Sequence, residues 1–319
     1  MTEFITGGGF ANHPLPQGLK QEGMLMLSSV LRDCSNIKDL QLTTCLDSRF
    51  TIDNSNVVIH TVESSTDYIK QVSYLAAGSD YTWVIAPESS GILESIVTQL
   101  NYDGVSTINC DAESIRITGD KIKCTSFLLN VGIPSAVNLS VEEANIFTSK
   151  TVIKNRFGVG CEGLKICDSG ASALEYIDDF NQWVVQPYIF GEHLSLSLLC
   201  SSGQAKILAC NKQIFSGELE PKLEACLVNA LPIDKQMETL ANKIATAFPG
   251  LASYVGVDII ASDDGYVVID INPRLTSSYA GLSEVLNINP AEVCMNTIIK
   301  GKLPEEVICN SQIAEVCFD

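Results

Sequence analysis

The first third of the chain alternates short apolar runs with amphipathic stretches. The apolar runs are rich in β-branched and aromatic residues, and they predict strands over residues 3–6, 40–44, 56–61 and 81–86. Apolar side chains recur at about 3.6-residue spacing from Leu19 to Leu31, which predicts an amphipathic helix, and a second helix is predicted over residues 94–100. Strands that alternate with helices are typical of an α/β domain with a parallel sheet.

Beyond residue 115 the pattern changes to strand pairs joined by glycine turns. A polar stretch over residues 111–123 breaks the alternation, and a helix over residues 125–132 ends at Gly132 before Pro134. The last hairpin pairs residues 257–261 with 266–271 across the turn SDDG, so this part is predicted to be α+β with antiparallel strands. The other predicted elements are strands over 151–154, 164–167, 183–188, 194–200, 206–212 and 255–260, and a helix over 171–180.

The charge balance excludes some partners. The net charge is −18, which would repel a phosphate backbone, so we expect no nucleic-acid partner. No apolar run is long enough to span a bilayer and no basic segment precedes an apolar one at Met1, so a cytoplasmic protein without a membrane partner is expected. The twelve cysteines form no CxxC pair and are expected to be reduced core residues.

Acidic residues interrupt the apolar runs of the last predicted hairpin. Asp258 lies on one strand, and Asp270 and Asn272 share a face of the next. Two carboxylates and an amide oxygen suit Mg²⁺ when water and phosphate oxygens supply its other ligands. Arg274 follows on the same face, where a guanidinium can hold a phosphoryl group during transfer. The alternative is that Asp258 faces solvent, but unpaired carboxylates inside apolar runs are costly without a cation.

The segment GVGCEG has the spacing of a dinucleotide-binding turn. A turn of that kind opens a helix, whereas this segment is followed by the strand-like run LKIC. Together with Lys154 it instead predicts a hairpin whose backbone N–H groups cover phosphates, with a plain surface turn as the alternative. The segment VVQPYIFGEHLSLS has the character of a hinge strand that could bind adenine through its backbone, or of an ordinary edge strand.

These pieces stand in the order found in the ATP-grasp superfamily, which the chain resembles over about residues 115–300. The motifs EFITGGG, QEGMLML, NKQ and DINPRLTSSYAGL are similar to those of the branch that joins glutamate to tyramine in methanofuran biosynthesis. The resemblance implies an α/β pre-ATP-grasp (Rossmann-like) domain over residues 1–115, followed by an α+β ATP-grasp domain over 116–319. Two subdomains, 116–185 with the lid and 186–319 with the metal site, would clamp the nucleotide.

Carried onto this sequence, the resemblance assigns most of the candidate site. Lys121, Lys154 and the loop with Gly158, Gly160 and Gly163 would bind nucleotide phosphates. Gln186, where many members have an acid, would frame adenine with Tyr188 and Ile189, and either Glu192 or His193 would contact ribose. Catalysis would rest on Arg274 and Lys212, and the metal on Asp258, Asp270 and Asn272.

The implied activity is an ADP-forming ligase that joins a small-molecule carboxylate, such as glutamate, to an amine, such as tyramine, through an acyl phosphate. The cofactors would be ATP and Mg²⁺, with Mn²⁺ as an alternative, and a homodimer is expected. The turns TGGG at residues 6–9 and TSSY at 276–279 are candidate contacts for the substrate carboxylate. A regulatory nucleotide-binding protein without turnover and an NAD(P)-dependent oxidoreductase are the alternatives.

Overall fold

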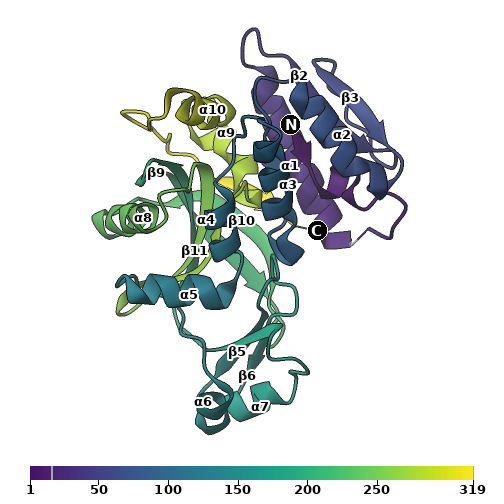
Figure 1. The fold of residues 1–319 in the computed structure, drawn as a ribbon. Helices are drawn as coiled ribbons and strands as arrows, with labels where there is room; N and C mark the ends of the chain where they lie inside the picture. The colour runs from purple at the N-terminus through teal and green to yellow at the C-terminus, as the bar shows by residue number, and fades with distance from the viewer. Residues whose placement is uncertain (16, 319) are drawn as a thin grey trace.

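In the computed structural model, which describes residues 1–15 and 17–318, the first hundred residues pack helices against short parallel strands (Figure 1). Strand β1 pairs with β4, and β2 pairs with β3, both in parallel as predicted. The predicted apolar face of the first helix is buried, including Leu27, Val30 and Leu31. The elements are β1 (Thr2–Glu3), α1 (Gln17–Ser35), β2 (Leu42–Asp47), β3 (Val57–Val62), α2 (Ser65–Ala77), β4 (Val84–Ile85) and α3 (Ile92–Tyr102).

The first strand is shorter than the sequence predicts. It ends at Glu3, and Ile5–Gly9 forms a π-helical turn instead of continuing the strand. The Glu3 carboxylate accepts hydrogen bonds from the backbone N–H of Ile5 (3.1 Å) and of Thr6 (2.7 Å), and from the Thr6 hydroxyl (2.6 Å). Hydrogen bonds to the buried Glu3 carboxylate therefore replace the strand ladder at this point.

Two short helices, α4 (Ala112–Thr118) and α5 (Lys121–Asn130), cross from the N-terminal part to the rest of the chain. The sequence predicts a polar break here and a helix only from residue 125. Helix α4 forms within the predicted break, and α5 begins earlier than predicted, because an aspartate caps each one: Asp111 accepts from the N–H of Ser114, and Asp120 from those of Ile122 and Lys123. Residue 115, the predicted domain boundary, lies inside α4.

A small antiparallel sheet of order β6-β5-β7 forms the end of the molecule farthest from the N-terminal part (Figure 1). The predicted hairpin across GVGCEG is confirmed, with Thr151 opposite Cys167. Helices α6 and α7 cover this sheet, and α7 is shorter than the predicted helix over residues 171–180. The elements are α6 (Val141–Ile146), β5 (Thr151–Asn155), β6 (Lys165–Cys167), α7 (Gly170–Leu174) and β7 (Trp183–Pro187).

A six-stranded antiparallel sheet of order β12-β11-β8-β9-β10-β13 occupies the centre of the molecule. The predicted last hairpin is confirmed in its register, with Val257 opposite Ile271 and Ala261 opposite Tyr266. Strands β10 and β13 and the helices after residue 230 are not predicted. The elements are β8 (Glu192–Ser201), β9 (Gln204–Ser216), β10 (Lys222–Leu231), α8 (Lys235–Ala247), β11 (Ser253–Ser262), β12 (Gly265–Asn272), α9 (Leu282–Val285), α10 (Pro290–Lys300) and β13 (Ala314–Cys317).

One apolar cluster joins the N-terminal part to the central sheet. It contains residues of α1 together with Leu199, Leu208 and Val228 of the sheet, and the ring of Trp83 lies edge-on to that of Tyr279 at 6.4 Å. Nine of the twelve cysteines are buried, in agreement with the core role expected for them. Within the described residues, every helix is too short or too polar to cross a bilayer.

The contact between α6 and α7 leaves no room for a side chain at Gly170. A Cβ atom there would lie 2.1 Å from the carbonyl oxygen of Ala144, which is rigid helix backbone. We predict that Gly170→Ala lowers the free energy of unfolding by about 2 kcal/mol, the usual effect of overpacking. Thermal and urea denaturation followed by circular dichroism would measure it.

The matched control is Gly18→Ala in α1, where a Cβ atom would meet no other atom within 4 Å. It should be neutral or stabilising by about 0.5–1 kcal/mol, because alanine favours helix. Equal effects of the two substitutions would contradict the packing described for α6 and α7.

Candidate active site

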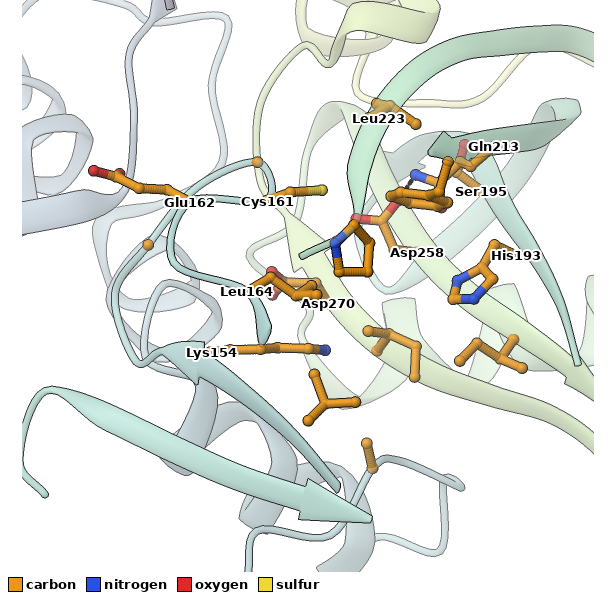
Figure 2. Close-up of a pocket in the computed structure, with 18 of the residues that line it drawn as sticks. Lys154, Cys161, Glu162, Leu164, His193, Ser195, Gln213, Leu223, Asp258 and Asp270 are labelled. Carbon is orange, nitrogen blue, oxygen red and sulfur yellow. Dashed lines mark hydrogen bonds between the residues drawn. The ribbon is translucent and has the colours of Figure 1, made fainter. Parts of the chain in front are cut away.

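A cavity of about 630 Å³ lies between the small sheet and the six-stranded sheet. Its size is that of a site for a nucleotide or another small ligand. Side chains from β5, β7, β8, β9, β11 and β12 line it, and α1 and α5 contribute to its border. Figure 2 shows how Lys154, Asp258 and Asp270 extend into this space, while Glu162 points away from it.

Two carboxylates face each other across the last hairpin. Asp258 and Asp270 are Cα partners in the β11–β12 ladder, and a register shift follows them. Asp258 accepts hydrogen bonds from Asn272 (3.0 Å) and from Gln213 (2.9 Å). Burial, reinforced by the charge of Asp270, raises the pKa of Asp258 to about 6. The strand register thus concentrates negative charge at one point, as the acidic residues in apolar runs predict.

Three cationic side chains surround these carboxylates. The Nζ atom of Lys121 lies 2.9 Å from an oxygen of Asp270, and it also donates to the carbonyl of Gly158 (2.9 Å). Lys154 extends from β5, and its ammonium group makes no hydrogen bond or ion pair with any residue that the structure describes. Its burial lowers the pKa of Lys154 to about 8. An unpaired buried ammonium beside paired carboxylates suits an anionic ligand.

Arg274 is held by a residue of the N-terminal part. Its Nε atom lies 3.0 and 3.1 Å from the two carboxylate oxygens of Glu88, and both side chains are buried. Its Nη1 atom donates to the carbonyl of Leu275 (3.0 Å). The charges of Glu88, Glu22 and Asp270 keep the pKa of Arg274 raised despite its burial. The guanidinium therefore stays charged and fixed in direction at the edge of the cavity.

The other end of the cavity is less polar. Gln186, Tyr188, Ile189 and His193 line it, with the ring of Phe215 packed edge-on against His193 at 5.0 Å. The side-chain amide of Gln186 is buried and donates a hydrogen bond to the carbonyl of Ala136 (3.1 Å). Burial lowers the pKa of His193, so its imidazole is neutral at physiological pH. Flat apolar walls with backbone polar groups suit a heteroaromatic base.

Three residues that the sequence assigns to the site lie outside this cavity: Gly163, Glu192 and Lys212. Gly163 faces the ring of Trp183, and Lys212 donates a short hydrogen bond to Glu192. Successive side chains of a strand point to opposite faces, so Glu192 and His193 occupy opposite faces of β8. Glu192 therefore pairs with Lys212 on the face away from the cavity. Of the two candidates for ribose contact, His193 is thus the one on the cavity side.

Gln213 is a site residue that the sequence does not predict, although the motif NKQ contains it. Gln213 lines the cavity and bonds Asp258, whereas its neighbour Lys212 faces the other side of β9. Counting alternate residues along the predicted strand would have shown this. Glu88, and Glu22 within the motif QEGMLML, are also missed as site residues, because they come from elements far away in the sequence.

A network of hydroxyl groups lies under the cavity at the segment TSSY. The Tyr254 hydroxyl lies 2.8 Å from that of Thr276 and 3.0 Å from those of Ser278 and Ser197. Thr276, Ser277 and Ser278 themselves line the cavity. The segment TGGG does not line it, because it is folded into the π-helical turn beside β1 and Thr6 is buried there.

The donor set fits a magnesium ion that is bound together with a polyphosphate. No group of three or more His, Cys, Asp or Glu side chains in the described part of the chain is arranged to hold a metal by itself. Asp258, Asp270 and Asn272 offer oxygen ligands on one side only, and burial together with the charge of Asp270 raises the pKa of Asp258. Phosphate oxygens and water would have to complete such a shell.

Comparison with known proteins agrees with this geometry. The similar proteins include a tyramine–L-glutamate ligase from Methanocaldococcus jannaschii, which is 26% identical over 88% of this chain and 83% of its own length. A solved ATP-grasp superfamily protein from Archaeoglobus fulgidus has a TM-score of 0.70 and 21% identity, covering 100% of this chain and 98% of the other. A biotin carboxylase–β,γ-ATP complex from Campylobacter jejuni has a TM-score of 0.74 and 15% identity, covering 90% and 72%.

Two family models match successive parts of the chain. The model of the pre-ATP-grasp domain matches residues 40–115, and that of the ATP-grasp domain matches residues 118–278. The predicted fold, a pre-ATP-grasp domain followed by an ATP-grasp domain, is therefore confirmed, and the predicted class of ATP-dependent ligase agrees with the relative's name. With half of its length matched by the ATP-grasp model, this chain belongs to the ATP-grasp family.

Proposed function

We propose that the protein is an ADP-forming carboxylate–amine ligase that works through an acyl phosphate, and that it joins glutamate to an amine such as tyramine. The observation that carries the proposal is the meeting of Asp258 and Asp270 with Lys121, Lys154 and Arg274 in one cavity. Metal-binding carboxylates beside several buried cations are what phosphoryl transfer requires. The choice of substrates rests on the name of the Methanocaldococcus jannaschii relative.

In this proposal the substrate carboxylate attacks the γ-phosphorus of ATP, and ADP leaves. Lys154 and Arg274 would stabilise the charge that develops on the phosphoryl oxygens, since both are partly buried cations on the cavity wall. Asp258, Asp270 and Asn272 would hold Mg²⁺, which neutralises phosphate charge when bound. The amine nitrogen then attacks the acyl carbon, the bond from carbon to the phosphate oxygen breaks, and phosphate leaves with an amide as product.

We assign the hydroxyl network to the substrate carboxylate. Thr276, Ser277 and Ser278 reach the cavity next to Arg274, and Tyr254 holds the hydroxyls of Thr276 and Ser278 in place. Fixed hydroxyl donors close to a guanidinium suit a carboxylate that must face the γ-phosphate. The adenine would lie at the opposite end, between Tyr188, Ile189 and His193.

For the organisation of the chain, we propose domains over residues 1–115 and 116–319. The second would consist of a lid-bearing part, 116–185, and a metal-binding part, 186–319, with the cavity between them. We also propose a homodimer in the cytoplasm, and sedimentation velocity tests the dimer.

The first prediction concerns pH. MgADP binding should weaken about tenfold between pH 7 and 9, because Lys154, whose pKa is about 8, loses its charge over that range. His193, with a lowered pKa, stays neutral, and Lys121, with a raised pKa, stays charged. Isothermal titration calorimetry at several pH values measures the trend.

Lys154→Arg is the matched control for this pH effect. An arginine keeps its charge above pH 9, so the affinity of the variant should stay level across the same range. A wild-type affinity that does not change between pH 7 and 9 would show that the Lys154 ammonium does not bind the nucleotide.

The second prediction tests turnover. Incubation with ATP, Mg²⁺ and pools of amino acids and amines should produce ADP, phosphate and a new amide mass, and Asp270→Asn should lower kcat about 100-fold or more. The melting temperature should change little, because the substitution removes one of two opposed carboxylates. Asp263→Asn, in the exposed turn of the same hairpin, should keep full activity.

Two results would reject the proposal. If ATP is converted only to AMP, the acyl-phosphate route is excluded. If no pool supports turnover, a regulatory nucleotide-binding protein becomes the better description. An NAD(P)-dependent oxidoreductase is disfavoured because GVGCEG joins two antiparallel strands and does not open a helix.

A further inference from the structure

An unpaired carboxylate from the N-terminal part borders the cavity. Glu22, in the second turn of α1, is half-buried and lines the cavity wall. Its carboxylate forms no hydrogen bond and no ion pair within 4.0 Å with any residue that the structure describes. A carboxylate that is removed from water without a partner is costly, so its position calls for an explanation.

The other acidic side chains on the cavity wall are accounted for. Asp258 accepts hydrogen bonds, Asp270 forms an ion pair with Lys121, and both are proposed metal ligands. Glu162 and Glu218 are exposed to water. Glu22 is therefore the acidic residue of this wall that is both shielded from water and without an assigned role among the described residues.

The surroundings of Glu22 define what it could bind. It is close enough to Arg274 and to Cys161 to affect the pKa of both. Burial raises the pKa of Glu22, and the charge of Arg274 opposes this rise. A carboxylate here would repel phosphate groups and the substrate carboxylate, and it would attract a cation in a medium of low polarity.

We propose that Glu22 binds the primary ammonium group of a substrate, and so selects ammonium-bearing substrates next to Arg274. This inference rests on the proposed function, since both of its substrates carry such a group: the amine to be joined, and the α-ammonium of glutamate. A charge-assisted hydrogen bond from an ammonium would compensate the unpaired carboxylate. A metal ion is the weaker alternative, because Glu22 belongs to no group of three or more His, Cys, Asp or Glu side chains in the described chain that could hold one.

The test uses Glu22→Gln, which keeps the shape of the side chain and removes its charge. Three KM values are measured at pH 7.5: for MgATP, for glutamate with hydroxylamine as the nucleophile, and for tyramine with saturating glutamate. Hydroxylamine is uncharged at this pH, so hydroxamate formation reports carboxylate activation without a cationic nucleophile. The melting temperature and the hydroxamate reaction together show that the variant is folded.

We expect the KM of one ammonium-bearing substrate to rise at least about tenfold, with the KM of MgATP unchanged. A rise for tyramine alone assigns Glu22 to the amine, and a rise for glutamate assigns it to the amino acid. Glu63→Gln, an exposed acid of the same domain outside the cavity, should leave all three values unchanged.

The inference is overturned if neither substrate KM rises, or if the KM of MgATP rises to the same extent, since Glu22 would then act only through Arg274. A failure of the proposed function has a different signature. In that case the wild-type protein itself would form no hydroxamate and no ADP with glutamate.

Discussion

The site depends on the repulsion between two carboxylates that the β11–β12 register holds opposite each other. Asp258 and Asp270 are paired in the ladder, and the charge of Asp270 adds to burial in raising the pKa of Asp258. Lys121 relieves part of this repulsion through Asp270, and Asn272 and Gln213 donate to Asp258. A divalent cation would relieve the rest. The strand pairing thus brings together the oxygen groups that we propose as metal ligands.

The two parts of the chain meet at this charge cluster. Glu88 and Glu22 come from the N-terminal part, while Arg274 comes from the end of the last hairpin. The apolar contact of Trp83 with Tyr279 fixes the two parts against each other, so the ion pair between Glu88 and Arg274 keeps its geometry. Removing either charge of a buried pair typically leaves the other uncompensated at a cost of about 3–5 kcal/mol. The N-terminal part therefore helps to set the direction of a residue that we place at the phosphoryl group.

Local sequence patterns predict the features that local chemistry determines. Asp258 and Asp270 stand out because acids rarely interrupt apolar strands, and the GVGCEG hairpin is recognisable because a strand-like run follows it. Lys212 is assigned to phosphate by resemblance alone, and the structure pairs it with Glu192 on the far face of the strands. Contacts between residues that are far apart in the sequence leave no such local pattern. Glu22 reaches the cavity, and Glu88 reaches Arg274, only because the two parts of the chain pack together, and β13 pairs with β10 across more than eighty residues of chain.

The central claim is that the substrate carboxylate takes the γ-phosphoryl group before the amide forms. Glutamate labelled with ¹⁸O in its carboxylates tests it directly, with mass analysis of the phosphate released during amide synthesis. An acyl phosphate predicts one ¹⁸O atom in each phosphate, because the amine expels the oxygen that joined carbon to phosphorus. Phosphate without label, or label in AMP, would contradict the account.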